Sequence, residues 1–291
     1  MLSDAVRALR CPVCQDALGL EGTSPAEGAP SRRSLRCPAG HSFDAAKQGY
    51  FNLLTGKGTA FEADSPAMAA ARHDFLAAGH YAELSSLLVD LAAPALQAPD
   101  AVVLDSGTGT GNYLRAVLDH TPTASVGIDI SKFALRRAAR LNPDTINLVW
   151  DVWRPLPLGT HTVDLVTVVF APRNPAEFAR VLRPGGRAIV VTPRPGHLAE
   201  IAGLTGMLRI EEGKEERLAE SMGGHFTLAG QEALDIRLTL DEATAADLAF
   251  MGPAGHHLDR GQLLASLAGT GAVETTAKFA ISVFSTPAAA S

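Results

Sequence analysis

The fold of this 291-residue chain is decided by one segment, Val103-Leu-Asp105-Ser-Gly107-Thr-Gly109-Thr-Gly111-Asn112-Tyr113. Its apolar start predicts a strand that ends at Asp105, and glycines follow at alternate positions. Glycine lets the backbone approach a ligand closely, and open α/β sheets bind cofactors at the carboxyl ends of their strands. A dinucleotide fingerprint would require glycine at position 112, where this chain has Asn112. The segment therefore predicts a cofactor-binding loop and argues against NAD(P).

Short apolar runs recur around this segment and alternate with helix-like stretches. The predicted strands are Ala101–Asp105, Ser125–Asp129, Ile146–Trp150, Val163–Val169 and Arg187–Thr192, with two more near Ala233–Leu240 and Lys278–Ser285. Such alternation predicts an α/β fold, a Rossmann-like doubly wound parallel sheet with helices on both faces. Asp129 ends the second strand, where its carboxylate can accept hydrogen bonds from both hydroxyls of a ribose.

A second pattern uses every cysteine of the chain. Cys11-Pro-Val-Cys14 is followed by Cys37-Pro-Ala-Gly-His41. Two such knuckles give the tetrahedral Cys₃His ligand set of closed structural zinc sites. The alternatives are ordinary buried thiols or a redox Cys-x-x-Cys, but the redox motif needs a following helix, and the Gly/Pro/Ser-rich residues 22–34 follow here. We predict a structural Zn²⁺ bound by Cys11, Cys14, Cys37 and His41.

Length and composition limit the other possibilities. A chain with 46% hydrophobic and 19% charged residues is typical of a globular protein with one large core and a small accessory module. It has no apolar run of membrane-spanning length and no signal-peptide pattern, so we expect a cytoplasmic protein. The net charge of −6 gives no general nucleic-acid signal, so RNA binding would depend on local patches such as Arg32, Arg33 and Arg36.

The ordered motifs resemble the class I S-adenosylmethionine-dependent methyltransferases. Besides the glycines and Asp129, they include Asp151 after the third strand and Leu182-Arg-Pro-Gly-Gly186 before the fifth. The resemblance implies that Gly107–Gly111 surround the methionine moiety, that Asp129 holds the ribose and that Asp151 accepts the adenine amine. The cofactor-binding residues expected in the loop are Asp105, Gly107, Gly109, Thr110, Gly111 and Asn112.

Nearly the whole chain resembles a narrower family, the 23S ribosomal RNA guanine-N1 methyltransferases. The shared motifs are the two zinc knuckles, residues 43–54, residues 75–81 and Phe170-Ala171-Pro172. The run from Phe170 to Pro175 looks closest to the branch containing the tylosin-type macrolide-resistance methyltransferases. The resemblance implies a homodimer that methylates N1 of a guanine in the helix 35 hairpin of the peptide exit tunnel. A methyl group there would obstruct macrolides, hence macrolide resistance as an expected consequence.

The same resemblance implies further site residues. Tyr81 and His197 join the glycine loop at the cofactor, and the position of His197 after the fifth strand fits the carboxyl edge of the sheet. Residues 170–174 form the loop after the fourth strand, where related folds present the methyl acceptor. Arg173 and Asn174 are the candidates for orienting the base. The general base stays open, with a carboxylate or a water near Asp105 or Asn174 as the candidates.

Three parts are expected along the chain. Residues 1–60 form a zinc-binding, RNA-recognition module, residues 61–98 a helical connector that contributes to the cofactor site, and residues 99–291 the methyltransferase domain. In the connector, Ser65-Pro66 predicts a helix start. Two alternatives remain, a small-molecule methyltransferase and a non-catalytic zinc RNA-binding protein. The first has no need of a zinc module, and the intact glycine loop argues against the second.

Overall fold

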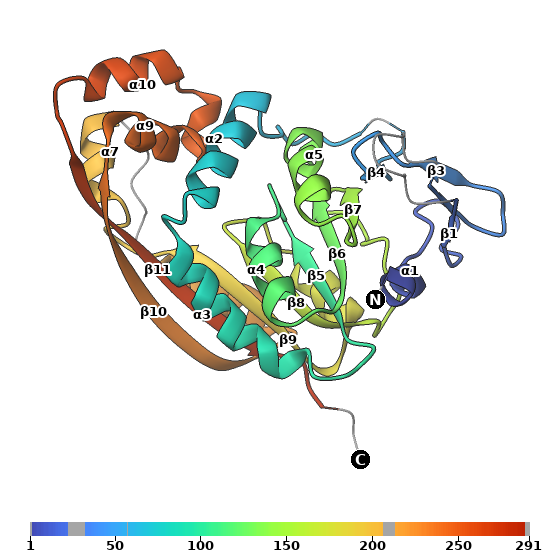
Figure 1. Cartoon of the computed structure of the whole chain (residues 1–291). Coiled ribbons are helices and arrows are strands. Elements are labelled where there is room, and N and C mark those ends of the chain that lie inside the picture. Colours follow the sequence, from blue (N-terminus) through green and yellow to red (C-terminus); the bar gives the residue numbers. More distant parts are fainter. Residues whose placement is uncertain (1, 23–32, 57, 206–212, 289–291) are drawn as a thin grey trace.

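The computed structural model describes residues 2–22, 33–56, 58–205 and 213–288 (Figure 1). An eight-stranded sheet forms the centre, with strand order β10-β11-β9-β8-β5-β6-β7-β4, and helices cover both of its faces. A separate three-stranded sheet, β1-β2-β3, lies at the end of the molecule farthest from β10. In the described part of the chain, no helix has the length and apolarity needed to span a bilayer.

Five parallel strands form the middle of the large sheet and confirm the predicted core. They are β5 (Val102–Ser106), β6 (Ala124–Asp129), β7 (Ile146–Val149), β8 (Val163–Val169) and β9 (Leu182–Pro193). All residues of β5 and β7 are buried, because helices cover both faces of a parallel sheet. The strand order reverses beside β5, which places its carboxyl end at the switch point where such sheets bind ligands.

The two C-terminal strands add antiparallel pairs to the parallel sheet, a direction that the sequence did not predict. β11 (Val273–Ser285) lies between β9 and β10 (Thr227–Leu240) and is antiparallel to both. The chain leaves β10 through α9 (Glu242–Phe250) and α10 (Arg260–Leu267), which stand at one end of the sheet (Figure 1), and returns along the neighbouring position. A return from the same end makes the two strands antiparallel, and alternation of helices and strands alone does not encode this direction.

Two helices follow the zinc module, and the first begins at the predicted position. α2 (Pro66–Ala77) begins at Ser65, whose Oγ accepts a hydrogen bond from the Met68 N–H at 3.1 Å, and α3 (Ala82–Ala92) follows. Further helices are α4 (Asn112–His120), α5 (Lys132–Leu141), α6 (Pro175–Val181), α7 (Ala199–Thr205) and α8 (Lys214–Gly223). Short 3₁₀ turns lie at Ala93–Ala95 and Pro253–His256.

The N-terminal module shares its core with the large sheet. It comprises α1 (Leu2–Ala8), β1 (Gly19–Glu21), β2 (Ser34–Arg36), β3 (Ser42–Asp44) and β4 (Phe51–Asn52). β4 pairs in parallel with β7, so the module supplies the edge strand of the large sheet. Leu9, Leu35 and Phe51 are fully buried in one cluster with Leu104 and Leu148 of the sheet. Residues 1–60 therefore depend on the larger domain for much of their packing.

Candidate cofactor site and metal centre

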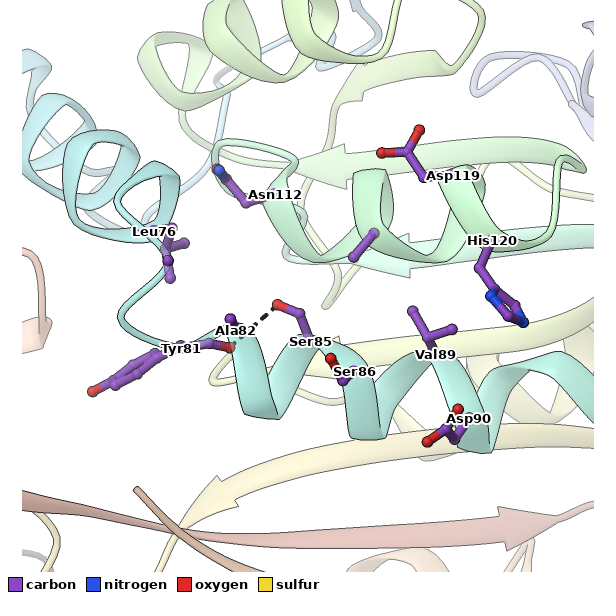
Figure 2. Close-up of a pocket in the computed structure, with 12 residues that line it drawn as sticks. Leu76, Tyr81, Ala82, Ser85, Ser86, Val89, Asp90, Asn112, Asp119 and His120 are labelled. Carbon is purple, nitrogen blue, oxygen red and sulfur yellow. Dashed lines mark hydrogen bonds between the residues drawn. The ribbon is translucent and has the colours of Figure 1, made fainter. Parts of the chain in front are cut away.

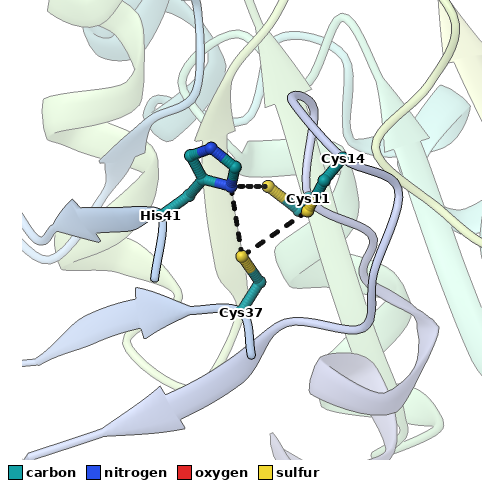
Figure 3. Close-up of side chains that lie close together, drawn as sticks. All are labelled: Cys11, Cys14, Cys37 and His41. Carbon is teal, nitrogen blue, oxygen red and sulfur yellow. Dashed lines mark hydrogen bonds between the residues drawn. The ribbon is translucent and has the colours of Figure 1, made fainter. Parts of the chain in front are cut away.

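Two turns of the N-terminal module bring the four predicted zinc ligands together (Figure 3). Cys11 and Cys14 lie in the turn after α1, and Cys37 and His41 in the turn between β2 and β3. The Cys37 N–H donates to the His41 carbonyl at 3.1 Å, which closes the second turn.

The spacing of the donor atoms suits one Zn²⁺. His41 Nδ1 lies 3.6 Å from Cys11 Sγ and 3.3 Å from Cys37 Sγ, and Cys14 Sγ lies 3.6 Å from Cys37 Sγ. All four donor atoms lie within 4.8 Å of one another. A tetrahedral ion with Zn–S bonds of about 2.3 Å separates its sulfurs by roughly 3.8 Å. Thiolates and imidazole are the donors that zinc prefers, so the residues fit the metal.

The glycine loop, residues 107–111, connects β5 to α4 in left-handed backbone conformations. Gly107, Gly109 and Gly111 have φ of 76°, 54° and 84°. A Cβ at Gly107 would lie 2.2 Å from the Ala171 Cβ, and one at Gly111 would lie 2.7 Å from Asn142 Nδ2. At Gly109 the nearest atom would be Arg72 Cδ at 3.8 Å. Protein packing thus requires the outer two glycines, whereas a Cβ at the middle one would make only ordinary van der Waals contacts with Arg72.

Asp129 ties this loop to the start of α5. Its Oδ2 accepts from the Gly109 N–H at 2.9 Å and its Oδ1 from the Ser131 N–H at 2.7 Å. Burial raises the pKa of Asp129 to about 6, against the opposing effect of these two N–H donors. Each carboxylate oxygen keeps a second lone pair, so the group can still accept from two ribose hydroxyls.

Polar side chains of the loop are held by neighbours. Thr167 Oγ1 donates to Asp105 Oδ1 at 2.7 Å, and burial raises the pKa of Asp105. Thr110 Oγ1 donates to Asn112 Oδ1 at 2.7 Å. Hydrogen bonds within the protein therefore fix the polar side chains of the loop, as expected of a preformed site.

The turn after β7 presents Asp151 beside Thr59, near the end of the zinc module. Its Oδ1 accepts from the Trp153 N–H at 3.0 Å, and its Oδ2 from Thr59 Oγ1 at 2.8 Å. Asp151 is buried, so these two hydrogen bonds replace some of those that its carboxylate would make with water. A ligand amine at Oδ2 would have to share or replace the Thr59 bond.

Three aromatic residues meet around Phe279, a fully buried residue of β11. Its ring centroid lies 5.1 Å from Tyr81, 5.0 Å from His197 and 5.3 Å from Phe170. Sequence reasoning missed Phe279, since nothing distinguishes it from any other core residue of a strand. Phe279 therefore brings Tyr81 and His197 to the same end of the sheet as the loop after β8, residues 170–174.

Burial sets the protonation of two of these groups. It raises the pKa of the Tyr81 phenol above its ordinary range. It lowers the pKa of His197 to about 4, although a hydrogen bond of 3.0 Å with the Lys278 backbone opposes the shift. Both side chains are therefore neutral at pH 7, which suits contact with a cationic sulfonium.

The loop after β8 contains both candidate base-orienting residues. Phe170 has φ of 56°, an unusual conformation for a non-glycine residue, and its side chain is 43% exposed. Asn174 caps α6: its Oδ1 accepts from the Glu177 N–H at 3.4 Å and its Nδ2 donates to the Val152 carbonyl at 2.9 Å. Arg173 is half-buried and, among the described residues, makes no hydrogen bond or ion pair. Burial lowers the pKa of Arg173.

An open groove of about 600 Å³ lies between α3 and α4. Figure 2 shows Tyr81 and Asn112 at one end of it and His120 at the other, with the Tyr81 ring directed away from the groove. Only Tyr81 and Asn112 belong to the predicted cofactor residues, so this groove borders the glycine loop without containing it.

The structure describes two of the three arginines in the predicted RNA patch, Arg33 and Arg36. Arg33 is 8% exposed, with its Nη2 only 3.2 Å from a Cβ built at Gly49, so the turn at Gly49 covers it. Arg36 is exposed but paired, since its Nε lies 3.2 Å from Ser42 Oγ and 3.5 Å from Glu21 Oε2. Arg32 lies outside the described residues, as does most of the 22–34 stretch. The prediction is wrong for Arg33.

Comparisons with known proteins match both parts of the chain. A zinc-ribbon model described as "RlmA, N-terminal" matches residues 9–57, and a model described as "Methyltransferase domain" matches residues 103–186. A solved structure, the YcgJ protein from Bacillus subtilis, covers 70% of this chain and 100% of its own length. Its TM-score is 0.50 at 16% identity, a likeness that shows the fold alone.

Two relatives match almost from end to end. One is the 23S rRNA (guanine(748)-N(1))-methyltransferase of Streptomyces fradiae, 44% identical over 271 residues, which are 92% of this chain and 92% of the relative. The other, from Micromonospora griseorubida and named "Putative 23S rRNA (guanine-N(1)-)-methyltransferase", is 46% identical over 283 residues, 92% of this chain and 93% of the relative. The predicted fold class, a class I methyltransferase with an N-terminal zinc module, is confirmed. The chain belongs to the 23S rRNA (guanine-N1)-methyltransferase family.

Proposed function

We propose that this protein transfers a methyl group from S-adenosylmethionine to N1 of a guanine in 23S rRNA. The observation that carries the proposal is the combination of a Cys₃His zinc cluster and a glycine-loop site in one continuous core. Relatives named for this reaction match both parts together over 92% of the chain. A small-molecule methyltransferase would need only the second part.

The residues around the glycine loop fit the cofactor. Gly109 leaves space for the methionine moiety, Asp129 can accept from the ribose, and Asp151 offers a carboxylate at the adenine end. Tyr81 and His197 add neutral surroundings from the connector and from the residues after β9. The bound cofactor supplies an activated methyl group on its sulfonium, so the protein has mainly to position donor and acceptor.

The loop after β8 supplies groups suited to an unpaired guanine. N1 lies on the Watson–Crick edge, so the base must be unpaired or flipped out before it reacts. Phe170 offers an exposed ring for stacking, and the unpaired guanidinium of Arg173 can donate to O6. Donation to O6 stabilises the negative charge that develops as N1 loses its proton and gains the methyl group. Asn174 acts by holding this loop against the turn after β7.

Cofactor affinity should depend on pH through Asp129. The pKa of this buried carboxyl is raised to about 6, so the charge that accepts the ribose hydroxyls is lost as the pH falls through that value. Between pH 7.5 and 5.0 we expect the affinity for S-adenosylhomocysteine to fall about tenfold. Titration calorimetry across this range measures it. Asp129→Asn is the control, since it should bind weakly with a flat profile, and a flat wild-type profile would refute the role.

Replacing Arg173 should weaken catalysis on RNA and leave the affinity for the cofactor unchanged. A charge-assisted hydrogen bond is worth about 1.5–3 kcal/mol, so Arg173→Ala should lower kcat/KM for RNA roughly 10- to 100-fold. Steady-state methylation of rRNA, with calorimetry for S-adenosylhomocysteine, separates the two effects. Arg115→Ala is the matched control, because Arg115 pairs with Asp119 on α4 away from this loop. Equal losses in both variants would contradict the assignment.

We further propose that residues 1–60 and α5 together contact the RNA, while residues 61–98 complete the cofactor site. α5 packs against the zinc module through Leu135 and Tyr50, and its Lys132 and Arg140 are exposed. These two cations replace the buried Arg33 as candidate phosphate contacts. By the resemblance, the target is a guanine of the helix 35 hairpin, and its methylation would confer macrolide resistance.

A homodimer, also implied by the resemblance, is supported by the position of β10, which is the outer strand of the large sheet among the described residues. β10 is an outer strand whose residues from Thr227 to Ala233 are exposed, which makes it available for pairing with another copy. Light scattering during size exclusion distinguishes a dimer from a monomer of 30.4 kDa.

The experiment that tests the acceptor class uses tritiated S-adenosylmethionine. The protein is offered total rRNA and, separately, a small-molecule extract of the same cells. Label in the RNA alone supports the proposal. Label in the extract and none in RNA would identify a small-molecule methyltransferase, the alternative left open by the sequence.

A further inference from the structure

The zinc module and the connector meet in a segment that we call the strap, residues 58–64. Arg154 donates to the Gly58 carbonyl at one end, and Arg72 pairs with the Asp64 carboxylate at the other. Between them, Thr59 donates to Asp151. The Asp64 carbonyl also accepts from Ser131 Oγ at 3.0 Å. The strap is thus held by side chains of α2, of the start of α5 and of the turn after β7.

Arg72 reaches from α2 to the glycine loop. Its Cδ and Nη1 lie 3.8 Å and 3.9 Å from a Cβ built at Gly109, so the Arg72 side chain lies directly against that glycine. Its side chain is 26% exposed, and it donates to Asp64 and to the Met251 carbonyl. Its positive charge lowers the pKa of Asp129, against the larger effect of burial. Arg72 therefore lies within electrostatic range of the loop as well as of the strap.

The amino-acid end of S-adenosylmethionine carries a carboxylate. A carboxylate that enters a partly dehydrated site needs a cation or several N–H donors. A guanidinium is well suited, because it pairs with carboxylates through two parallel hydrogen bonds. In the structure that guanidinium already binds a carboxylate, the one of Asp64.

We propose that Arg72 binds the carboxylate of the cofactor's methionine moiety. Before the cofactor binds, the strap occupies two of the groups that the cofactor needs: Asp64 pairs with Arg72, and Thr59 donates to Asp151. This inference rests on the proposed cofactor. Binding of the cofactor displaces Asp64 from Arg72 and the Thr59 hydroxyl from Asp151, so it removes two of the four contacts that hold the strap. The strap competes with the cofactor and lowers its apparent affinity.

Two ligands distinguish contacts at the amino-acid end of the site from contacts at the nucleoside end. S-adenosylhomocysteine carries the amino-acid carboxylate, and 5′-methylthioadenosine has the same nucleoside without it. Arg72→Ala should weaken S-adenosylhomocysteine roughly 10- to 100-fold and leave methylthioadenosine unchanged, and Arg72→Lys should restore part of the loss. Asp64→Asn, which weakens the competing pair, should tighten S-adenosylhomocysteine severalfold. Thr59→Val should tighten both ligands, because it frees Asp151.

Titration calorimetry and thermal melting of the full chain provide the readouts, with Arg115→Ala as the control arginine. Equal weakening of both ligands in Arg72→Ala would show that Arg72 only supports the fold through Met251, and would overturn the proposal. Unchanged affinity for S-adenosylhomocysteine in Arg72→Ala would overturn it too. A wild-type chain that binds neither ligand would refute the proposed cofactor itself.

Discussion

Gly109→Val is expected to weaken S-adenosylhomocysteine binding roughly 100-fold while the chain stays folded, since forcing methyl groups into a filled site costs about 1–3 kcal/mol. The protein itself leaves room here, because a Cβ would meet nothing nearer than Arg72 at 3.8 Å. The added side chain would instead enter the space reserved for the methionine moiety. Calorimetry gives the affinity, and thermal melting shows whether the fold survives.

The control must match the backbone strain of this substitution. Gly109 has φ of 54°, where any side chain is strained. Gly185 has φ of 78° and nothing within 4 Å of a built Cβ, and it lies far from the glycine loop in the sequence. Gly185→Val should therefore lose similar stability and keep its affinity. Normal binding by Gly109→Val would mean that the cofactor lies elsewhere.

Removal of zinc is expected to destabilise the whole chain, including the methyltransferase domain. The module supplies β4 to the large sheet, and Leu9, Leu35 and Phe51 belong to the core of that sheet. Structural zinc contributes about 10 kcal/mol in small modules, so chelation or Cys37→Ser should lower the melting temperature by on the order of 10 °C or more.

Metal analysis and calorimetric melting with and without chelator measure this effect. The Cys37→Ser protein should also lose hydrogen-exchange protection along the β4–β7 pair before the rest of the sheet. A purified chain without stoichiometric zinc, or an unchanged melting temperature after chelation, would contradict the account.

The parts of the fold that the sequence predicted are those with strong local patterns. The glycine loop and the apolar runs that alternate with helix-like stretches favour a buried parallel sheet. The zinc knuckles are equally local, since turn chemistry and ligand type coincide at Cys37 and His41. The helix start at Ser65 followed from its capping hydroxyl.

The parts it could not predict depend on contacts between distant segments. The direction of β11 is set by where the chain returns after α10, and the pairing of β4 with β7 joins a two-residue strand to a sheet far along the chain. Arg33 appeared to be a surface cation because sequence does not reveal that the turn at Gly49 covers it. The contacts of the strap could not be predicted either, because its hydrogen bonds join residues far apart in the sequence, such as Thr59 and Asp151.

The central claim, methyl transfer to guanine N1, is tested most directly by analysing the nucleosides of 23S rRNA after reaction with the purified protein. N1-methylation blocks the Watson–Crick edge, so reverse transcription of the same RNA should stop beside the modified base. We predict that 1-methylguanosine appears by mass spectrometry and that one stop appears at a hairpin guanine, both absent with Gly109→Val. Methylation at any other atom, or 23S rRNA that stays unmodified while the protein binds S-adenosylhomocysteine, would contradict the account.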